Sequence, residues 1–398
     1  MEEGFESSAD FGRAVAMDHE HKIQLRGDLE LYYETKRKEH KLDDTAITKR
    51  LIGEPNRLMD RDIIYAHKDF DRVLDASLEG EEWAVVSGLN PSGPLHFGHK
   101  AMFDVLLWMQ RTFGATVYIP ITNDETYLVH KSSSLAESRN IAYTSVIPSI
   151  IALGFDPLKT HIFVHSDFPA IHQLALHVSR YTTYNNVRSL FGWTGSENPG
   201  IVYYMGALQF ASILLPQVVE LGGPKRVVVP VGIDQHPYVA LARDVAHKLH
   251  ITPPAEVIWK FLPGLRSPEL KMSSSDPDHA LFLDDSPDVA RRKIRRAFSG
   301  GSANRAFHER YGAVPEVCSI FNLLRYNFLN DDEWAKLSSD YSTGKLLTSK
   351  LKQIAETHVL SFLEEHAALK ARAESLVDNY IIKLELTSLT KYDDPFTL

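Results

Sequence analysis

Residues 90–99 read NPSGPLHFGH, and this stretch decides how the first half of the chain is interpreted. It follows a short apolar segment, residues 83–87, and precedes a segment in which apolar residues recur at helical spacing. A strand that turns into a helix in a parallel sheet does so at the carboxyl edge of the sheet, where exposed helix amides attract phosphate. The turn carries two imidazoles, and we expect the helix to begin at His99. The stretch therefore predicts phosphate chemistry at a sheet edge.

The rest of the apolar pattern predicts an α/β fold. Short apolar segments separated by helical ones occupy residues 83–87, 116–121, 161–164 and 226–231. Such alternation is typical of a Rossmann-like, doubly wound parallel sheet. After about residue 288 the pattern becomes helical, with a long amphipathic run over residues 345–382.

These patterns divide the chain into three predicted parts. Residues 1–75 are polar and highly charged, and we expect them to form an N-terminal extension. Residues 76–290 are expected to form the Rossmann-like catalytic domain, and residues 291–398 a helical C-terminal domain.

Composition excludes several classes of protein. The chain has 398 residues, is 44% hydrophobic and carries a formal net charge of −9, which argues against a protein that coats nucleic acid non-specifically. A single cysteine, Cys318, excludes an internal disulfide framework and a cysteine-rich zinc site. The amino terminus is acidic, and the longest apolar stretch, around residues 146–155, is interrupted by Pro148 and Ser149. We expect a soluble cytoplasmic protein.

Familiar phosphate and metal motifs are missing from the sequence. The residue after Gly98 is His99 rather than lysine, so the stretch is not a Walker phosphate loop. The chain contains no dinucleotide fingerprint and no His-Glu-x-x-His zinc motif.

The turn at residues 90–99 suits a phosphate-centred reaction. Pro91, Gly93 and Gly98 keep it tight and allow a ligand to approach the backbone closely. Imidazoles of His96 and His99 aimed at an α-phosphate would stabilise developing charge, an effect worth roughly 3 kcal/mol per donor. Taken alone, a His-x-x-His pair is also compatible with a buried helix cap or with metal ligands.

A second motif lies at residues 270–277, which read LKMSSSDP. Serine-rich turns are usually only solvated backbone. Here, however, Lys271 precedes three hydroxyl groups, and a lysine on an exposed loop can follow the β- and γ-phosphates as pyrophosphate departs.

Together the two motifs resemble the paired HIGH and KMSKS motifs of class I aminoacyl-tRNA synthetases, as HFGH at residues 96–99 and KMSSS at residues 271–275. Three further stretches are similar to the tryptophanyl subgroup of archaeal and eukaryotic type: GIDQHPY at residues 232–238, ARDVA at 242–246 and AFSGG at 297–301. The similarity extends over most of the chain and is weakest at the amino terminus.

The resemblance implies a homodimer that activates L-tryptophan with ATP and Mg²⁺, without a protein-ligated metal, and then charges tRNA(Trp). It also implies that residues 291–398 bind the anticodon. It gives catalytic roles to His96, His99 and Lys271. It implies ATP-binding roles for Gly88, Pro91, Ser92, Gly98, Gly232, Asp234, Met272, Ser273, Ser274 and Ser275. It implies amino-acid-binding positions at Val86, Pro120, Glu125, Gln209 and Gln235.

Two of these positions depart from the pattern of similar tryptophanyl enzymes. Those enzymes place a tyrosine and a glutamine against the indole, whereas this chain has Val86 and Pro120. Neither side chain can hydrogen-bond the indole, and an unmet buried N–H costs about 1 to 3 kcal/mol. We expect a neighbouring subgroup with a rebuilt pocket.

Several other interpretations of the sequence predict different residues or contacts. Tyrosyl enzymes place an aspartate three residues after the pocket glutamine, where this chain has Ser212, which counts against tyrosine. A small-molecule nucleotidyltransferase would not predict the KMSSS stretch, and a silent RNA-binding paralogue would be expected to have lost one catalytic side chain. The basic cluster at residues 291–296 suits tRNA phosphates, but equally a solvated helix face that pairs with Asp284, Asp285 and Asp288.

Overall fold

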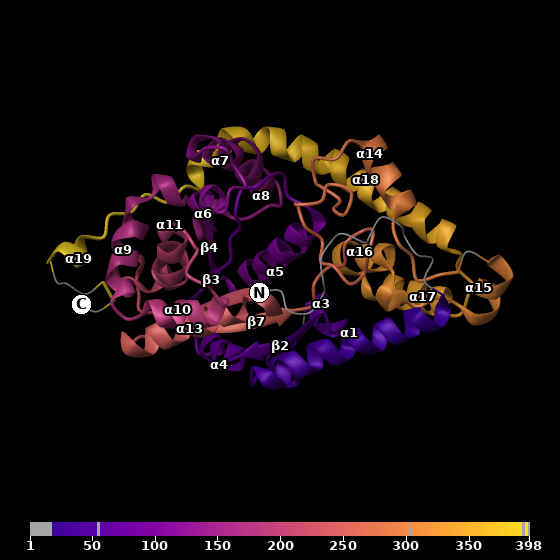
Figure 1. The fold of residues 1–398 in the computed structure, drawn as a ribbon, viewed down its shortest axis with the longest axis horizontal. Coiled ribbons are helices and arrows are strands. Elements are labelled where there is room, and N and C mark those ends of the chain that lie inside the picture. The colour runs from indigo at the N-terminus through magenta and orange to yellow at the C-terminus, as the bar shows by residue number, and fades with distance from the viewer. Residues whose placement is uncertain (1–17, 54–55, 303, 392–394, 397–398) are drawn as a thin grey trace. The chain divides into compact units, whose positions relative to one another are not determined.

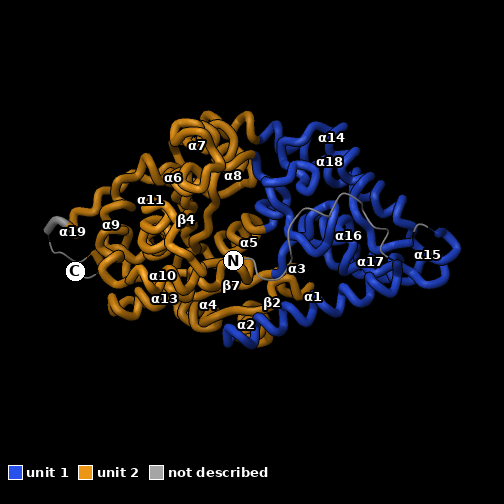
Figure 2. Tube along the Cα trace, in the orientation of Figure 1, with its two compact units in different colours: residues 1–41, 94–101, 260–369 blue, residues 42–93, 102–259, 370–398 orange. Residues whose placement is uncertain are grey.

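The computed structural model describes residues 18–53, 56–302, 304–391 and 395–396. The chain forms two compact units (Figure 2). The helical unit comprises residues 1–41, 94–101 and 260–369, and the sheet unit comprises residues 42–93, 102–259 and 370–398. This division does not follow the boundaries predicted at residues 75 and 290, because segments distant in sequence pack into the same unit.

The sheet unit contains a mixed, mostly parallel sheet of seven strands (Figure 1). The strands are β1 (Asp43–Asp44), β2 (Ile64–Lys68), β3 (Trp83–Val86), β4 (Thr116–Ile121), β5 (Thr160–Val164), β6 (Arg226–Gly232) and β7 (Ala255–Trp259), in the order β1-β2-β7-β6-β3-β4-β5. The five strands from β7 to β5 are parallel to one another, and β1 and β2 add antiparallel pairs at one edge. The predicted parallel sheet is confirmed. The antiparallel β1–β2 edge arises from residues that we expected in the extension.

Helices connect the strands of the sheet unit. They are α2 (Ala46–Ile52), α3 (Arg57–Asp60), α4 (Phe70–Leu78), α5 (Phe97–Phe113), α6 (Asn123–Leu128), α7 (Leu135–Ile141), α8 (Ile147–Ile151), α9 (Pro169–Ser179), α10 (Tyr184–Phe191), α11 (Pro199–Tyr203), α12 (Gln209–Leu214), α13 (His236–Lys248) and α19 (Thr387–Lys391). Short 3₁₀ or π turns are η1 (Ala142–Val146), η2 (Pro157–Lys159), η3 (His165–Asp167), η4 (Tyr204–Leu208), η5 (Leu215–Gln217), η6 (Val219–Leu221), η7 (Ile233–Gln235) and η9 (Glu374–Asn379). The first turn of α5 belongs to the helical unit. That helix begins at Phe97, two residues before the predicted start, because His96 caps it.

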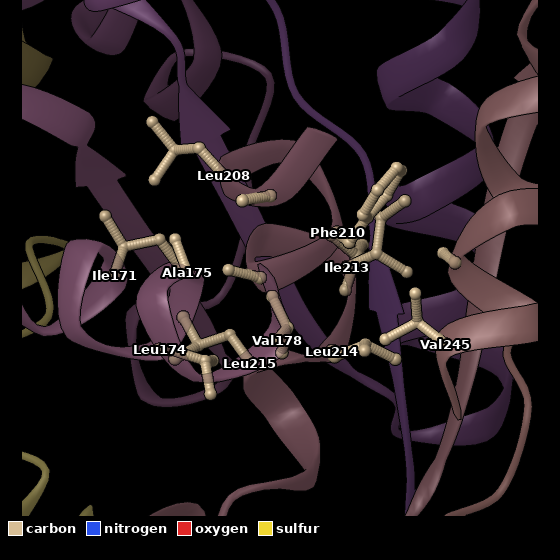
Figure 3. Close-up of a cluster of buried hydrophobic side chains, with 14 of the residues drawn as sticks. Ile171, Leu174, Ala175, Val178, Leu208, Phe210, Ile213, Leu214, Leu215 and Val245 are labelled. Carbon is tan, nitrogen blue, oxygen red and sulfur yellow. The ribbon is translucent and has the colours of Figure 1, made fainter. Parts of the chain in front are cut away.

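One face of the sheet is covered by a large apolar cluster built from α9, α12 and α13 (Figure 3). The side chains labelled there converge from these three helices, from η4 and from η5, and Leu174, Leu208 and Val245 are among the fully buried ones. The burial of these side chains removes apolar surface from water, and such burial is the main favourable contribution to the free energy of folding.

The stretch Pro199–Gln217 is long and apolar enough to cross a membrane. It consists of α11, η4, α12 and η5, and 67% of its apolar window is buried inside the protein. Its apolar character is therefore explained by the core of the sheet unit.

The C-terminal segment returns to the sheet unit. The Ile162 N–H donates to the Tyr380 carbonyl at 2.8 Å, and the Ile382 N–H donates to the Ile162 carbonyl at 3.0 Å. This pairing covers the free side of β5 and satisfies backbone groups that an open sheet edge would expose. Residues 291–398 are thus divided between the two units.

The helical unit contains α1 (His19–Glu39), α14 (Pro287–Arg296), α15 (Arg305–Tyr311), η8 (Pro315–Val317), α16 (Ser319–Asn327), α17 (Asp331–Ser342) and most of α18 (Thr348–Ala373). Leu351, Ala355 and Val359 of α18 are fully buried, and their spacing of four residues is that of one helix face. The predicted long amphipathic helix is confirmed.

The basic cluster at residues 291–296 lies on α14. Arg291 pairs with Asp288 at 3.0 Å, Lys293 with Asp285 at 2.8 Å, and Arg295 with Glu356 at 2.8 Å. The expected pairing with nearby aspartates is confirmed for Asp285 and Asp288, so this helix face neutralises much of its own charge.

Helix α9 supplies a matched test of the core. Leu174 is fully buried, whereas Leu176 on the same helix is 64% exposed. We expect Leu174→Ala to lower the free energy of unfolding by about 2 to 5 kcal/mol, because it leaves a cavity. Leu176→Ala should change that free energy by about 0.5 kcal/mol or less. Urea unfolding measures both, and equal losses would contradict the packing described here.

Candidate functional site

The histidine turn places two stacked imidazoles at the start of α5. The rings of His96 and His99 lie 3.7 Å apart, centroid to centroid, with an interplanar angle of 15°. His96 Nδ1 accepts from the N–H groups of Gly98 at 3.1 Å and His99 at 3.3 Å, and His99 Nδ1 accepts from the His96 N–H at 3.3 Å. His96 is therefore a helix cap, the structural role that the sequence left open.

This hydrogen bonding fixes the form of both rings. Because each Nδ1 accepts a backbone N–H, the proton of each neutral ring lies on Nε2, which can donate to a ligand. Burial lowers the pKa of His99 to about 4, and the nearby Lys271 charge acts in the same direction. Burial, the neighbouring His99 and Lys271 hold the pKa of His96 well below its usual range. Both imidazoles are neutral Nε2–H donors at neutral pH.

Gly98 is required for this arrangement. A Cβ at this position would lie 2.9 Å from Cε1 and 3.0 Å from Nδ1 of His96, closer than real contacts allow. The ring folds back over the first helical turn only because the glycine leaves that space.

The lysine loop belongs to the same unit as the histidine turn. The N–H of Phe97 donates to the Leu281 carbonyl at 3.1 Å, and the N–H of Leu283 donates to the Leu95 carbonyl at 2.8 Å. His96 thus pairs with Phe282 in an antiparallel bridge, a few residues after the KMSSS stretch. The pairing brings the two sequence motifs into one compact unit.

The loop is held at its base and exposed beyond it. Leu270 and Met272 pair with Gly264 and Leu262 through N–H to carbonyl bonds of 2.8 and 2.9 Å. Met272 is buried and Lys271 is exposed, as we expected for a lysine that reaches a ligand. Ser275 is exposed and donates its N–H to Ser273 Oγ at 3.3 Å, while Ser273 and Ser274 are half-buried.

The sheet unit brings the predicted amino-acid-binding residues to the carboxyl ends of neighbouring parallel strands. Val86 ends β3 and pairs with Tyr118 of β4, and Pro120 pairs with Phe163 of β5. Because residues two apart on a strand share a face, these four side chains lie on one face of the sheet. Val86, Tyr118 and Phe163 are buried in the apolar cluster, and Val86 and Pro120 offer no hydrogen bond to an indole, as the sequence indicated.

Gly88 follows β3 and passes very close to β4. A Cβ there would lie 2.0 Å from the Pro120 carbonyl oxygen. The neighbouring Leu89 N–H donates to that oxygen at 3.2 Å. The predicted ATP-binding residues Pro91 and Ser92 follow, and Ser92 donates its N–H to the Asn90 carbonyl at 2.9 Å. Position 88 therefore requires glycine, because the two backbones approach too closely for a side chain.

Glu125 lies just beyond β4, near the start of α6. Its carboxylate accepts from Thr122 Oγ1 at 2.8 Å. Burial raises the pKa of Glu125, although the Thr122 and Tyr204 hydroxyls hydrogen-bond its ionised form. A buried carboxylate of this kind gains strongly from a cationic partner, such as an ammonium group.

Gln209 begins α12 and presents an unsatisfied acceptor. Its Oε1 is buried and has no hydrogen-bond partner among the residues that the structure describes. A buried acceptor without a partner costs about 1 to 3 kcal/mol, which a ligand N–H would recover. Gln209 thus has the chemistry that the resemblance implies.

Three polar residues beside Gln209 form a buried chain. His165 is fully buried after β5, with Nδ1 at 3.1 Å from Asp124 Oδ1 and Nε2 at 3.0 Å from Ser212 Oγ. Burial alone would raise the pKa of Asp124, but His165 and the Glu125 N–H lower it overall. Ser212 also donates to the Leu208 carbonyl at 3.1 Å, so its hydroxyl is engaged internally.

Strand β6 ends at Gly232, and η7 directly after it carries Asp234 and Gln235. Asp234 is exposed, and Gln235 Nε2 donates to Asp234 Oδ2 at 3.1 Å. Burial raises the pKa of Tyr238 to about 12, and the negative charges of Glu125 and Asp234 add to that shift. The charges of Glu125 and Asp234 thus both act on the Tyr238 hydroxyl.

The residues that sequence reasoning missed are Thr122, Asp124, His165, Tyr204 and Tyr238. Thr122 and His165 carried a signal, because each directly follows a predicted parallel strand, as ligand-binding residues often do. The others come from helices whose contacts depend on tertiary packing. Among the described residues no group of histidine, cysteine, aspartate and glutamate side chains has the geometry of a metal site.

Comparisons with known proteins agree with this geometry. The family model of class I tRNA synthetases (W and Y) matches residues 78–364. A tryptophan–tRNA ligase of Pyrobaculum aerophilum is 35% identical over 349 residues, which is 87% of this chain and 91% of that protein. The chain belongs to the tryptophan–tRNA ligases of class I.

Solved structures of this synthetase family have the same fold. The tryptophanyl-tRNA synthetase of Aeropyrum pernix has a TM-score of 0.81 and 34% identity, covering 89% of this chain and 97% of its own. The enzyme of Encephalitozoon cuniculi, bound to tryptophan, has a TM-score of 0.78 and 27% identity, covering 88% and 97%. The expected Rossmann-like class I fold is confirmed, as is the preference for the tryptophanyl over the tyrosyl reading.

The depressed pKa of His99 predicts how stability of the synthetase changes with pH. The unfolded chain binds a proton at a pKa near 6.5, whereas folded His99 does so only near 4. As the pH falls from 6.5 to 4 the unfolded state therefore binds more protons, and the free energy of unfolding decreases.

His99→Asn keeps an acceptor near the Nδ1 position but does not titrate. We expect the free energy of unfolding of this variant to depend less steeply on pH in this window than that of wild type. The difference in slope should correspond to the uptake of up to about one proton on unfolding. His247→Asn, on the exposed surface of α13, is the control. Parallel profiles for wild type and His99→Asn would contradict the buried, neutral state of His99.

Proposed function

We propose that this chain activates L-tryptophan with ATP, forming tryptophanyl-adenylate, and then transfers the tryptophanyl group to tRNA(Trp). In the first step a carboxylate oxygen of tryptophan bonds to the α-phosphorus. The bond from that phosphorus to the bridging oxygen of the β-phosphate breaks, and pyrophosphate leaves. The observation that carries the proposal is the backbone pairing that joins the histidine turn to the segment following Lys271 in one unit.

The phosphate chemistry is assigned to the helical unit. Neutral His96 and His99 would donate from Nε2 to oxygens of the α-phosphate as charge develops there, and preorganised donors of this kind supply much of a rate enhancement. Lys271, exposed on its loop, would neutralise charge on the departing pyrophosphate. Gly98 keeps the turn compact, and Met272, Ser273, Ser274 and Ser275 would line the ATP side of the loop.

The amino acid is assigned to the sheet unit. The Glu125 carboxylate and the unpartnered Gln209 Oε1 are suited to the α-ammonium group, and Gln235 would add an amide. Val86 and Pro120 would face the indole as apolar surface. Gly88, Pro91, Ser92, Gly232 and Asp234 would contact ATP from the sheet edge. A solved relative, the enzyme of Encephalitozoon cuniculi, is bound to tryptophan, which supports tryptophan as the amino acid.

Cofactor, partner and location follow from the same proposal. Mg²⁺ would enter with the phosphates of ATP, because metal-ion ligands in such complexes are largely phosphate oxygens and water. We propose tRNA(Trp) as the macromolecular substrate, with anticodon contacts from residues 291–398, and a cytoplasmic homodimer as the functional form.

Pyrophosphate exchange across a panel of amino acids tests the substrate. We expect tryptophan to support incorporation of labelled pyrophosphate into ATP, and tyrosine to support at least about 100-fold less, because no acceptor is provided for its phenol. Exchange with tyrosine but not tryptophan would overturn the substrate assignment. Exchange with no amino acid would favour a silent paralogue.

Lys271→Ala tests the phosphate role. We expect kcat for exchange to fall by about 100- to 1,000-fold, as for loss of one preorganised transition-state donor. The thermal midpoint should not change, since the side chain is exposed. Lys345→Ala, another exposed lysine of the helical unit, is the control and should retain full exchange. Wild-type kcat in Lys271→Ala would contradict the role.

Glu125→Gln tests recognition of the ammonium group. Loss of a charge-assisted hydrogen bond should raise KM for tryptophan by about 10- to 100-fold. Because the pKa of Glu125 is raised, wild-type KM should increase as the pH falls toward that pKa and the carboxylate is protonated. The Gln variant should lack this dependence, while the exposed Glu137→Gln serves as control. An unchanged KM in Glu125→Gln would contradict the assignment.

A further inference from the structure

Helix α1 precedes the segment matched by the family model, yet it contacts the base of the lysine loop. The Phe261 N–H donates to the Tyr33 hydroxyl oxygen at 3.0 Å. The ammonium group of the adjacent Lys260 lies 5.7 Å from the centroid of the Tyr33 ring. The Tyr33 hydroxyl therefore fixes the backbone at Phe261, and the Tyr33 ring packs against Lys260.

The Phe261 ring in turn contacts Lys271, the lysine of the KMSSS loop. Lys271 Nζ lies 5.3 Å from the centroid of the Phe261 ring, within the range of a cation–π contact. Residues 262–264, directly after Phe261, carry the backbone bonds that hold Leu270 and Met272. The position of the Lys271 ammonium thus depends on where the backbone at Phe261 is held.

A second contact anchors α1 independently of the loop. Lys22 is 6% exposed, and its ammonium group donates to the Gly301 carbonyl at 2.7 Å. It also lies 5.5 Å from the centroid of the Phe298 ring. Gly301 and Phe298 belong to the AFSGG stretch, so α1 binds two different parts of the helical unit through Lys22 and Tyr33.

We propose that Tyr33 is a positioning residue for Lys271: through the Phe261 backbone and ring, α1 sets the resting position of the catalytic ammonium group. A cation–π contact at an exposed site is worth about 0.5 to 1 kcal/mol, so it selects a position only if the ring itself is fixed. Tyr33 supplies that constraint. The inference rests on the proposed role of Lys271 and extends it to a residue outside the matched segment.

Tyr33→Phe removes the hydroxyl acceptor and keeps the ring. We expect kcat for pyrophosphate exchange to fall by about 3- to 30-fold, the range for residues that act through another. KM for tryptophan should not change, because the residues assigned to tryptophan lie in the sheet unit. Lys22→Met is the matched control: it weakens the other attachment of α1, and kcat should stay within about twofold of wild type. Thermal midpoints of both variants check that the fold is retained.

A double-mutant cycle with Lys271→Ala separates positioning from general destabilisation. If Tyr33 acts through Lys271, adding Tyr33→Phe to Lys271→Ala should cause no further loss of kcat. Equal losses in both backgrounds, or an equal loss in Lys22→Met, would overturn the proposal. So would unchanged exchange in Tyr33→Phe when Lys271→Ala alone is strongly impaired. If Lys271→Ala alone exchanges normally, the proposed role of Lys271 fails and the inference falls with it.

Discussion

The antiparallel pairing of residues 95–97 with residues 281–283 is the constraint on which the proposed phosphate chemistry depends. Two backbone hydrogen bonds hold a turn from the first third of the chain against a segment almost 200 residues later. The same pairing positions His96 to cap α5, and this cap fixes both imidazoles as neutral Nε2–H donors. Without it the two motifs would be separate stretches of sequence, each with an ordinary structural explanation.

The sheet unit buries polar groups next to apolar side chains. Parallel strands end at one edge, so Glu125, Asp124 and His165 collect there although they come from two different connections. Their hydrogen bonds compensate for burial, and the bond between His165 and Ser212 leaves the serine hydroxyl occupied. Gln209 Oε1 is buried without a hydrogen-bond partner among the described residues, and under the proposed function the ammonium group of tryptophan would supply one.

Sequence predicted the parts of this structure that are encoded locally. The four predicted strands are short, continuous apolar segments, the long helix near residues 345–382 has a helical apolar pattern, and the motif residues have distinctive chemistry. Strand β2 was missed because IYAHK mixes apolar and polar residues and is stabilised by pairing with β7. The two-unit division, the capping bonds of His96 and the contacts of Tyr204 and Tyr33 were not predictable, because each depends on residues far away in the chain. The predicted roles of individual site residues await experiment.

We assign ground-state binding of tryptophan to the sheet unit and phosphate chemistry to the helical unit. Equilibrium binding of tryptophan to a triple variant, His96→Asn, His99→Asn and Lys271→Ala, tests this assignment most directly. We propose that the three side chains act only in the transition state, as charge develops on the phosphates and pyrophosphate leaves. The Kd for tryptophan should then stay within about twofold of wild type while exchange is abolished. A Kd weakened by about tenfold or more in a folded variant would contradict the account.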